Sequence, residues 1–575
     1  MDLSYEKNNN DVLFDSFADC NLLNMKCVQN YIPIYRNFFS LNDTNYNKIN
    51  LKHEHKLKNI REKHSENKFT VTLENKQGEL VDKSAFFKMI PLIDPIKYIT
   101  SKYEPLGKTL LTLPSLLDNE LGIAKVRDTN NSAYVDGFFN FLSSMMLDNL
   151  GFIHGIGFYG SYLGLKNDFS FDIGEDIEHL RDCKSFHVNR NVLYNFDTLL
   201  QYDLMDRDSR DYKRPIKILQ SKDDDNNLEL TDVEEIETTE QSTLEIDDSV
   251  SLLYDSPMKN DTGNASSKSS SQCSSRSSNT SKSESESESE SESESESESE
   301  SLSKSVSELD SNHSIDESSS LSTDYEESVY IKIKLFPIQV VALEKCDDTL
   351  DSYLTSCEVS DDEYGSIVTQ ILMILITYQK VFELTHNDLH TNNIMYVKTD
   401  KQYIFYTYDD KCYKVPTFGK IYKIIDFGRS IYKFRGSLLC SDSYHSKGDA
   451  ATQYNFEPYF DSNKKRIEPN FSFDLCRLGC ALYDMLVNDP ESQHTPIVEI
   501  MANWCIDDKG RNVLYKTNGE ERYPDFKLYK MIARTVHNHI PSEELKNPYF
   551  QRYLIPKKKC KKKKIINIDN FSCHK

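Results

Sequence analysis

The stretch HNDLHTNNIM, residues 386–395, says most about the fold and function of this 575-residue chain. It directly follows the segment Tyr364–Leu384, which is apolar nearly all round and therefore predicts a buried helix. Asp388 and Asn393 are five residues apart. We expect both to lie on a loop that connects this helix to a strand.

A second acidic residue of interest lies downstream, in the run IIDFG at residues 424–428. Asp426 ends an apolar strand-like run, and a glycine follows two residues later. Phosphoryl transfer needs one carboxylate that accepts the proton of the attacking hydroxyl, and a carboxamide and a second carboxylate that hold metal ions. We therefore expect Asp388 to be the catalytic base, and Asn393 and Asp426 to ligate Mg²⁺.

These two stretches resemble the protein-kinase family, whose catalytic loop H-x-D-L-x-x-x-N is present as HNDLHTNN and whose D-F-G motif is intact. With FFKMIPLIDP and KIIDFGRS, the pattern is most similar to the divergent Ser/Thr-type kinases of giant DNA viruses, of mimivirus type. The resemblance covers roughly residues 85–554. It implies an α+β, bilobal fold, with a small β-rich N-lobe and a larger helical C-lobe, and ATP and Mg²⁺ as cofactors.

The resemblance also implies how ATP is held. Lys88, in the strand-like run 85–90, matches the lysine that grips the α- and β-phosphates, and Asp136 is the best candidate for its carboxylate partner. Asp136 falls in Ser132–Leu150, an amphipathic segment that predicts a helix with Ser132 as its N-cap. The residues alone favour a lysine that faces solvent and a solvated aspartate.

Residues 341–346, VALEKC, resemble the hinge of the family. By this resemblance, the backbone of Glu344 and Cys346 would hydrogen-bond adenine, and Leu343 would lie at the back of the pocket. All three are expected to take part in ATP binding.

Supporting positions of the family are matched as well. Asp474 begins a D-x-x-x-L-G pattern, which implies a buried anchor below the catalytic loop, and Glu457 lies 31 residues after Asp426, about where the activation segment closes. The loop contains His386 and His390, and no further cluster of His or Cys lies nearby in the sequence. We expect packing and hydrogen-bonding roles for these histidines rather than a metal site.

The sequence also departs from the family pattern. No G-x-G-x-x-G precedes Lys88, so the lid over the phosphates must be weak or built differently. Asn387 replaces the arginine of the catalytic loop, and His390 replaces the lysine that is common two residues after the base.

The net charge of −24 lies in one segment. Residues 221–328 contain 30 acidic and 6 basic residues, while the rest of the chain carries 62 of each sign. Nine consecutive Ser-Glu dipeptides occupy residues 283–300, and this composition predicts a long disordered acidic insert. Because its serines are followed by glutamates, we expect phosphorylation there and binding to basic partners.

The chain ends near a lysine run at residues 557–564. Such a run is typical of a nuclear-localisation or nucleic-acid patch, but a solvated tail, or one that pairs with the acidic insert, fits equally. Contact with nucleic acid is expected only through this tail.

These assignments predict the domain organisation. In chain order we expect an unassigned N-terminal extension (1–80), the first part of the N-lobe (81–220), the disordered Ser/Glu-rich insert (221–328), the last N-lobe strand and hinge (329–345), the C-lobe (346–555) and a basic C-terminal tail (556–575).

Composition excludes several classes of protein. The N-terminus, MDLSYEKNNN, lacks a secretory signal, and the longest strongly apolar run, Ile371–Ile376, is far below the ~20 residues that span a bilayer. The 13 cysteines include no C-x-x-C pair. We expect an intracellular, soluble protein of the host cytoplasm or nucleus, or one packaged in a virion, without membrane contact.

Three functions remain open on the sequence. The first is a serine/threonine protein kinase that acts on a protein substrate. The second is a small-molecule phosphotransferase on the same fold, because a D-L-H-x-x-N loop also occurs in such enzymes. The third is a catalytically weak kinase-like scaffold that acts through its acidic insert and basic tail.

Overall fold

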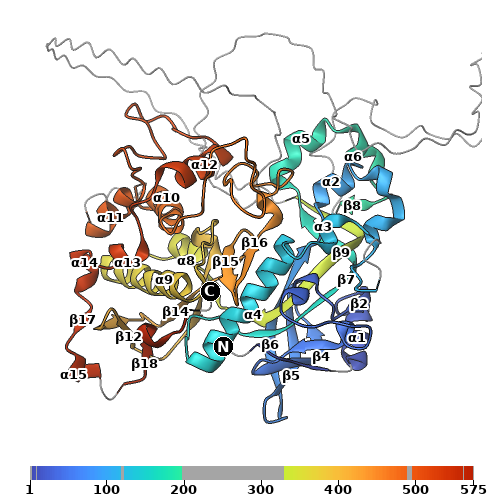
Figure 1. The fold of residues 1–575 in the computed structure, drawn as a ribbon, viewed down its shortest axis with the longest axis horizontal. Coiled ribbons are helices and arrows are strands. Elements are labelled where there is room, and N and C mark those ends of the chain that lie inside the picture. The colour runs from blue at the N-terminus through green and yellow to red at the C-terminus, as the bar shows by residue number, and fades with distance from the viewer. Residues whose placement is uncertain are drawn as a thin grey trace, which may run out of the picture. The chain divides into compact units, whose positions relative to one another are not determined.

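The fold combines α-helices with β-sheets, as the sequence predicts, and Figure 1 shows a curled sheet together with a set of helices. The structure is a computed structural model that describes residues 3–7, 10–117, 122–196, 329–487, 495–560 and 563–573. All of these residues belong to one unit of the chain. The insert predicted at 221–328 lies outside the described residues, and the two-lobed arrangement stays a prediction.

The largest sheet of the described residues has seven antiparallel strands, in the order β2-β7-β9-β6-β5-β4 with β8 paired to β9. Its strands are β2 (Met25–Gln29), β4 (His55–Lys63), β5 (Lys68–Asn75), β6 (Leu80–Pro91), β7 (Phe158–Asp172), β8 (Tyr194–Phe196) and β9 (Tyr330–Glu344). The strand predicted at residues 85–90 is therefore part of β6.

Strand β6 presents two different faces. Ala85 and Phe87 are buried on one face, where the Phe87 ring lies 4.6 Å from that of Phe69. Lys88 lies on the opposite face, because side chains alternate along a strand, and its register partner is Val341 of β9.

The face that carries Lys88 is covered by helix α4 (Ser132–Leu150). A Cβ atom added at Gly137 of α4 would lie 2.2 Å from Gln339 Nε2 of β9, so the helix backbone packs directly on this face. The helix has the predicted bounds, but its N-cap is Asn131, whose side chain accepts from Ala133 N, and not Ser132. Gly151 ends the helix in the left-handed conformation, with φ of 66°.

Helix α9 (Asp361–Phe382) is the buried helix that the sequence predicts. Ser360 caps its N-terminus by accepting from Glu363 N, and Glu383 ends it in the left-handed conformation. Among the described residues, α9 is the one helix with the length and hydropathy of a membrane span, but 94% of that window is buried inside the protein. Such burial is typical of a core helix.

Two antiparallel strands follow α9 and carry the candidate loops at their ends. β11 (Ile394–Lys398) pairs with β14 (Lys420–Ile424), and Ile394 is the register partner of Ile424. Residues that precede β11 therefore lie beside residues that follow β14. Smaller sheets complete this region; their strands are β10 (Asp348–Thr349), β12 (Tyr403–Tyr408), β13 (Lys411–Pro416), β15 (Ile431–Phe434), β16 (Ser437–Cys440), β17 (Leu554–Ile555) and β18 (Ile565–Asn567).

A second hydrophobic cluster surrounds helices α10 (Phe473–Val487) and α12 (Phe526–Thr535). Helix α11 (Pro496–Trp504) packs against α10. The other α-helices are α1 (Asp11–Ala18), α2 (Pro95–Ile99), α3 (Ala124–Arg127), α5 (Ile177–Arg181), α6 (Lys184–Asn189), α8 (Leu350–Ser356), α13 (Pro541–Glu544), α14 (Pro548–Gln551) and α15 (Lys557–Cys560).

Two of the expected boundaries do not follow the structure. The extension drawn at residues 1–80 contains β2, β4 and β5, which pair into the large sheet. The tail drawn at 556–575 contains β18, which runs parallel to β12, and Phe571, which is buried. The first segment is Asn- and Lys-rich and the second begins with a lysine run, and these compositions conceal the apolar residues that both segments bury.

Candidate active site

Three charged side chains from three elements meet over the face of β6 that α4 covers. Lys88 Nζ lies 3.0 Å from Asp136 Oδ1 on α4 and 3.0 Å from Asp426 Oδ1, which follows β14. Asp136 is 1% exposed and Asp426 is 39% exposed. The alternatives in which Lys88 faces solvent and Asp136 is solvated are therefore wrong.

Asp136 also holds the residues after Asp426 in place. Its Oδ1 accepts a 2.6 Å hydrogen bond from Phe427 N, and its Oδ2 accepts one of 3.2 Å from Asn140 Nδ2. The carboxylate thus joins the strand lysine to the D-F-G stretch. Because Asp136 is buried, its pKa is raised, although the ammonium of Lys88 opposes this shift.

The charges of the other two groups are set by the same contacts. Burial alone would lower the pKa of the Lys88 ammonium. The negative charges of Asp136 and Asp426 outweigh burial and raise this pKa. Burial alone would raise the pKa of Asp426, but the positive charge of Lys88 outweighs burial and holds the pKa of that carboxyl at about 2. Asp426, with a φ of +63°, therefore presents a permanent carboxylate that is partly open to solvent.

The loop after α9 is anchored from below by a buried carboxylate at the start of α10. Asp474 Oδ2 accepts from His386 N at 2.9 Å, and Asp474 Oδ1 accepts from Asn387 N at 2.8 Å. The ring nitrogen Nε2 of His386 lies 2.9 Å from the carbonyl oxygen of Ile425, next to Asp426. These bonds tie the two candidate loops to each other and to α10.

Asp388 lies in this loop within a ring of polar and cationic groups. Tyr529 OH, from α12, donates to Asp388 Oδ1 at 2.8 Å, and Arg429 Nη1 lies 3.8 Å from the same oxygen. Tyr529 OH in turn accepts from Arg477 Nε at 3.0 Å. One carboxylate oxygen of Asp388 is thus held, and Oδ2 is the oxygen that can accept a proton from a hydroxyl group.

Asn393 lies between Asp388 and Asp426. Its Nδ2 donates to Asp388 O at 2.9 Å, and its carbonyl oxygen accepts from Ile425 N at 3.0 Å. The amide oxygen Oδ1 and the carboxylate of Asp426 form the donor set that Mg²⁺ prefers. Mg²⁺ in such sites is held by one or two side chains together with substrate phosphates, so this pair fits MgATP.

His390 is buried beside these residues, and its Nε2 lies 3.1 Å from Asn393 Nδ2. Burial lowers the pKa of its ring to about 4, although the charge of Asp388 opposes this, so the ring is neutral at physiological pH. No group of three or more His, Cys, Asp or Glu within the described residues is arranged to hold a metal ion. His390 thus takes part in packing and hydrogen bonding, and the absence of a metal role stays a prediction.

The expected hinge, residues 341–346, covers the end of β9 and the two residues after it. Leu343 and Cys346 are buried, and burial raises the pKa of the Cys346 thiol to about 12. The N–H of Glu344 donates to Gly157 O at 2.8 Å, and its carboxylate pairs with the buried ammonium of Lys423. That N–H is therefore occupied, and contacts of these residues with adenine stay a prediction.

Glu457 lies apart from the loops. Its carboxylate is 60% exposed and forms two bonds with Arg466, Nη1 to Oε1 at 3.0 Å and Nη2 to Oε2 at 2.6 Å. It supports its own segment at the surface, and the structure gives it no contact with Asp388.

Sequence reasoning missed Arg429, Arg477 and Tyr529. Arg429 directly follows the D-F-G stretch, so its position was a usable signal. Tyr529 is 141 residues from Asp388 and belongs to no motif, so only the tertiary fold reveals it.

Comparison with known proteins adds little on activity. No family model matches the chain. Over 140 residues, 23% of the chain, the sequence is 29% identical to a protein of Invertebrate iridescent virus 6 named "Uncharacterized protein 098R". The match covers 23% of that protein, so the chain spans about a quarter of the curated relative it matches. The relative is viral, which agrees with a viral origin of this chain.

Proposed function

We propose that the chain is an ATP-dependent protein kinase that transfers the γ-phosphoryl group of ATP to serine or threonine hydroxyls of a protein substrate. The observation that carries the proposal is the position of Lys88, 3.0 Å from both Asp136 and Asp426. A lysine so placed can neutralise phosphates, and Asp388 and Asn393 lie on the adjoining loop.

The residues divide the chemistry among them. Lys88 grips the α- and β-phosphates, and Asn393 and Asp426 hold Mg²⁺, which neutralises the phosphates when it is bound. Asp388 Oδ2 accepts the proton of the attacking hydroxyl while the bond from the γ-phosphorus to the β,γ-bridging oxygen breaks and ADP leaves.

The lid over the phosphates would be the hairpin between β4 and β5. Its turn, residues 64–67, lies beside β6 because Lys68 is the register partner of Phe86, and Asn67 O accepts from Phe87 N at 2.8 Å. The turn reads His-Ser-Glu-Asn and contains no glycine. We therefore expect weaker closure over ATP than a glycine-rich loop would allow.

A kinase-like scaffold is the second candidate, and the same hairpin favours it. A turn without glycine next to the phosphates would close over the nucleotide less well and lower its affinity. One observation argues against the scaffold candidate, because a scaffold has no need to keep Lys88 paired with two carboxylates. On either reading the acidic insert would recruit basic partners, and we propose a location inside the host cell or the virion.

Nucleotide binding distinguishes the kinase from the scaffold candidate. We expect MgATP to raise the melting temperature of the wild-type protein, and Lys88→Met and Asp426→Asn each to reduce this shift, because each removes a charge that faces the phosphates or the metal. Lys420→Met, which breaks a partly buried ion pair with Glu363 elsewhere, is the control. Absence of any shift with the wild-type protein would favour the scaffold.

Turnover identifies the substrate class. A peptide array with labelled ATP should show incorporation into serine or threonine, and Asp388→Asn should lower turnover by roughly 10²–10⁴-fold with ATP binding largely intact. Incorporation only into small alcohols would favour the small-molecule phosphotransferase. Equal activity of mutant and wild type would refute Asp388 as the base.

A further inference from the structure

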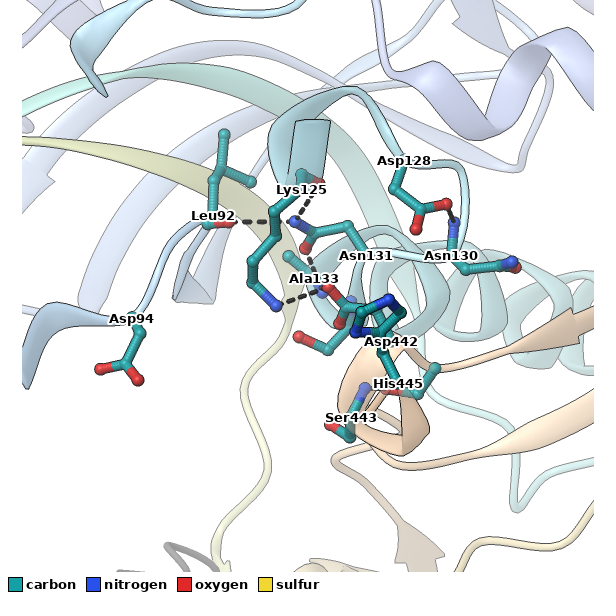
Figure 2. Close-up of polar contacts among 12 residues, drawn as sticks. Leu92, Asp94, Lys125, Asp128, Asn130, Asn131, Ala133, Asp442, Ser443 and His445 are labelled. Atoms are coloured by element: carbon teal, nitrogen blue, oxygen red, sulfur yellow. Dashed lines mark hydrogen bonds and ion pairs between the residues drawn. The ribbon is translucent and has the colours of Figure 1, made fainter. Parts of the chain in front are cut away.

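The start of α4 is bound to the segment that follows the D-F-G stretch by one polar cluster, shown in Figure 2. Asp442 begins the 3₁₀ turn Asp442–Tyr444. Its Oδ2 forms an ion pair with Lys125 Nζ at 2.5 Å. Its Oδ1 accepts from Ser132 N, the first residue of α4, at 3.0 Å. Asp442 N donates to Asn130 O at 2.8 Å, so backbone and side chain both join the two segments.

The same cluster reaches the large sheet through Asn131, which is fully buried. Its Nδ2 donates to Leu92 O, just after β6, and to Lys125 O, each at 3.0 Å, while its Oδ1 accepts from Ala133 N. Figure 2 shows Leu92, Lys125, Asn131 and Asp442 gathered at one end of α4. The end of the Lys88 strand, the start of the Asp136 helix and the segment after D-F-G therefore share one set of bonds.

The charges of the cluster suit its position. The Asp442 side chain is 8% exposed, and it lies at the N-terminus of a 19-residue helix, where backbone N–H groups carry partial positive charge. Lys125, at 36% exposure, supplies the balancing charge. A buried carboxylate with a cation and backbone donors is strongly held, and removal of either partner leaves the other uncompensated.

The position of α4 decides whether the site can form. Asp136 lies four residues after Ser132, about one helical turn from the contact with Asp442. A displaced or frayed first turn would move Asp136 away from Lys88 and from Phe427 N, with which it makes bonds of 3.0 and 2.6 Å.

We propose that Asp442 and Lys125 are positioning residues that hold α4 where Asp136 meets Lys88, and that Asp442 is the built-in anion that fixes this arrangement without phosphorylation of the segment. The proposal rests on the proposed function for its consequence in nucleotide binding. Its structural core, the hold of Asp442 on the first turn of α4, can be measured separately.

The test is a double-mutant cycle on the full-length protein. Lys125→Met and Asp442→Asn should each weaken MgATP binding by about 5- to 50-fold. Lys125→Arg, which keeps the charge, should retain most of the wild-type affinity. In an Asp136→Asn background, Lys125→Met should add less than about twofold, because both act through the same Lys88 contact. Lys420→Met is the control for loss of a comparable ion pair.

Hydrogen exchange gives the independent readout. Asp442→Asn should speed exchange in the peptide that contains residues 131–136, and Lys420→Met should leave it unchanged. Unchanged exchange, or MgATP losses that simply add in the Asp136→Asn background, would overturn the proposal. If the wild-type protein binds no MgATP, the proposed function fails, while faster exchange in Asp442→Asn still supports the hold on α4.

Discussion

At the scale of single residues, the hydroxyl of Tyr529 decides how the candidate base is presented. It donates to Asp388 Oδ1 at 2.8 Å, and the guanidinium of Arg429 approaches the same oxygen from 3.8 Å. The hydrogen bond and the nearby cation on one oxygen orient the carboxylate, so under the proposed function the other oxygen would receive the proton of the substrate.

Tyr529→Phe removes the first donor and leaves Arg429 in place. We expect the turnover number to fall by about 10- to 100-fold, the value of one hydrogen bond to a charged group, while the KM for ATP stays unchanged. Steady-state kinetics with a fixed peptide substrate measure both constants. Tyr515→Phe, which removes a hydroxyl bonded to Asp484 away from the loop, is the control. An equal rise in the KM for ATP would show that Tyr529 supports the fold instead.

His390 makes stability depend on pH. Burial lowers the pKa of its ring to about 4, below the ordinary value of 6.5, so the unfolded chain binds a proton that the folded protein does not. Stability is then full above pH 6.5 and decreases as the pH falls toward 4. His390 alone accounts for about 2 kcal/mol between pH 6.5 and 4.5.

His390→Gln should therefore reduce the slope of the free energy of unfolding against pH over this range. Urea unfolding at several pH values measures the slope directly. A slope identical in wild type and His390→Gln would refute the assignment.

At the scale of elements, the segment between Gly428 and Glu457 is held by carboxylates of its own. Arg429 Nη2 bonds Asp449 Oδ2 at 2.9 Å, and Asp442 binds Lys125 and the start of α4. Asn387, which replaces the loop arginine, is uncharged and accepts from Tyr454 OH at 2.7 Å.

Because these cations are already paired, we expect the segment to be ordered without a phosphate. We expect phosphatase treatment to change activity by less than about twofold. Activity before and after treatment, with mass spectrometry of residues 428–457, is the measurement. A loss of activity traced to a phosphorylated residue of this segment would contradict the prediction.

The sequence predicted the elements whose signals are local. Asp388, Asn393 and Asp426 lie in motifs of fixed spacing next to an apolar helix and strand, and the structure brings these loops together. The residues alone favoured a solvated Asp136, although its neighbours Val135 and Phe138 are apolar, and this was wrong. That outcome depends on the face of β6 over which α4 packs.

Strands β4 and β5 both escaped prediction, and for β4 there is a physical reason. Register shifts between Leu57 and Asn59, and between Ile60 and Glu62, break the strict alternation by which a strand is recognised. The buried Leu57 and Ile60 of β4 are separated by Lys58 and Asn59, so composition alone suggested an extension. Strand β5 keeps a strict alternation of Phe69, Val71 and Leu73 with threonines, which was a usable signal.

At the scale of the whole molecule, the predicted acidic insert falls in the connection between strands β8 and β9, where the fold can accommodate a long insertion. Phe196, the last described residue before it, is the register partner of Ile331, close to where the description resumes at Val329. The two ends thus meet on neighbouring strands, β8 and β9, and a short linker could join them. Closure entropy grows only logarithmically with loop length, so the long insert costs the fold little.

Deletion of residues 221–328 should therefore leave the melting temperature and the turnover number nearly unchanged. The same deletion should weaken a salt-sensitive association with a basic peptide, because it removes the entire net charge of −24. Replacing the glutamates of 283–300 by glutamine preserves the length and lowers the charge, so it should reproduce much of the loss of association with unchanged catalysis. Peptide binding at low and high salt, together with thermal unfolding and kinase assays of both variants, measures these effects. A deletion that unfolds the protein or abolishes turnover would show that the insert belongs to the fold.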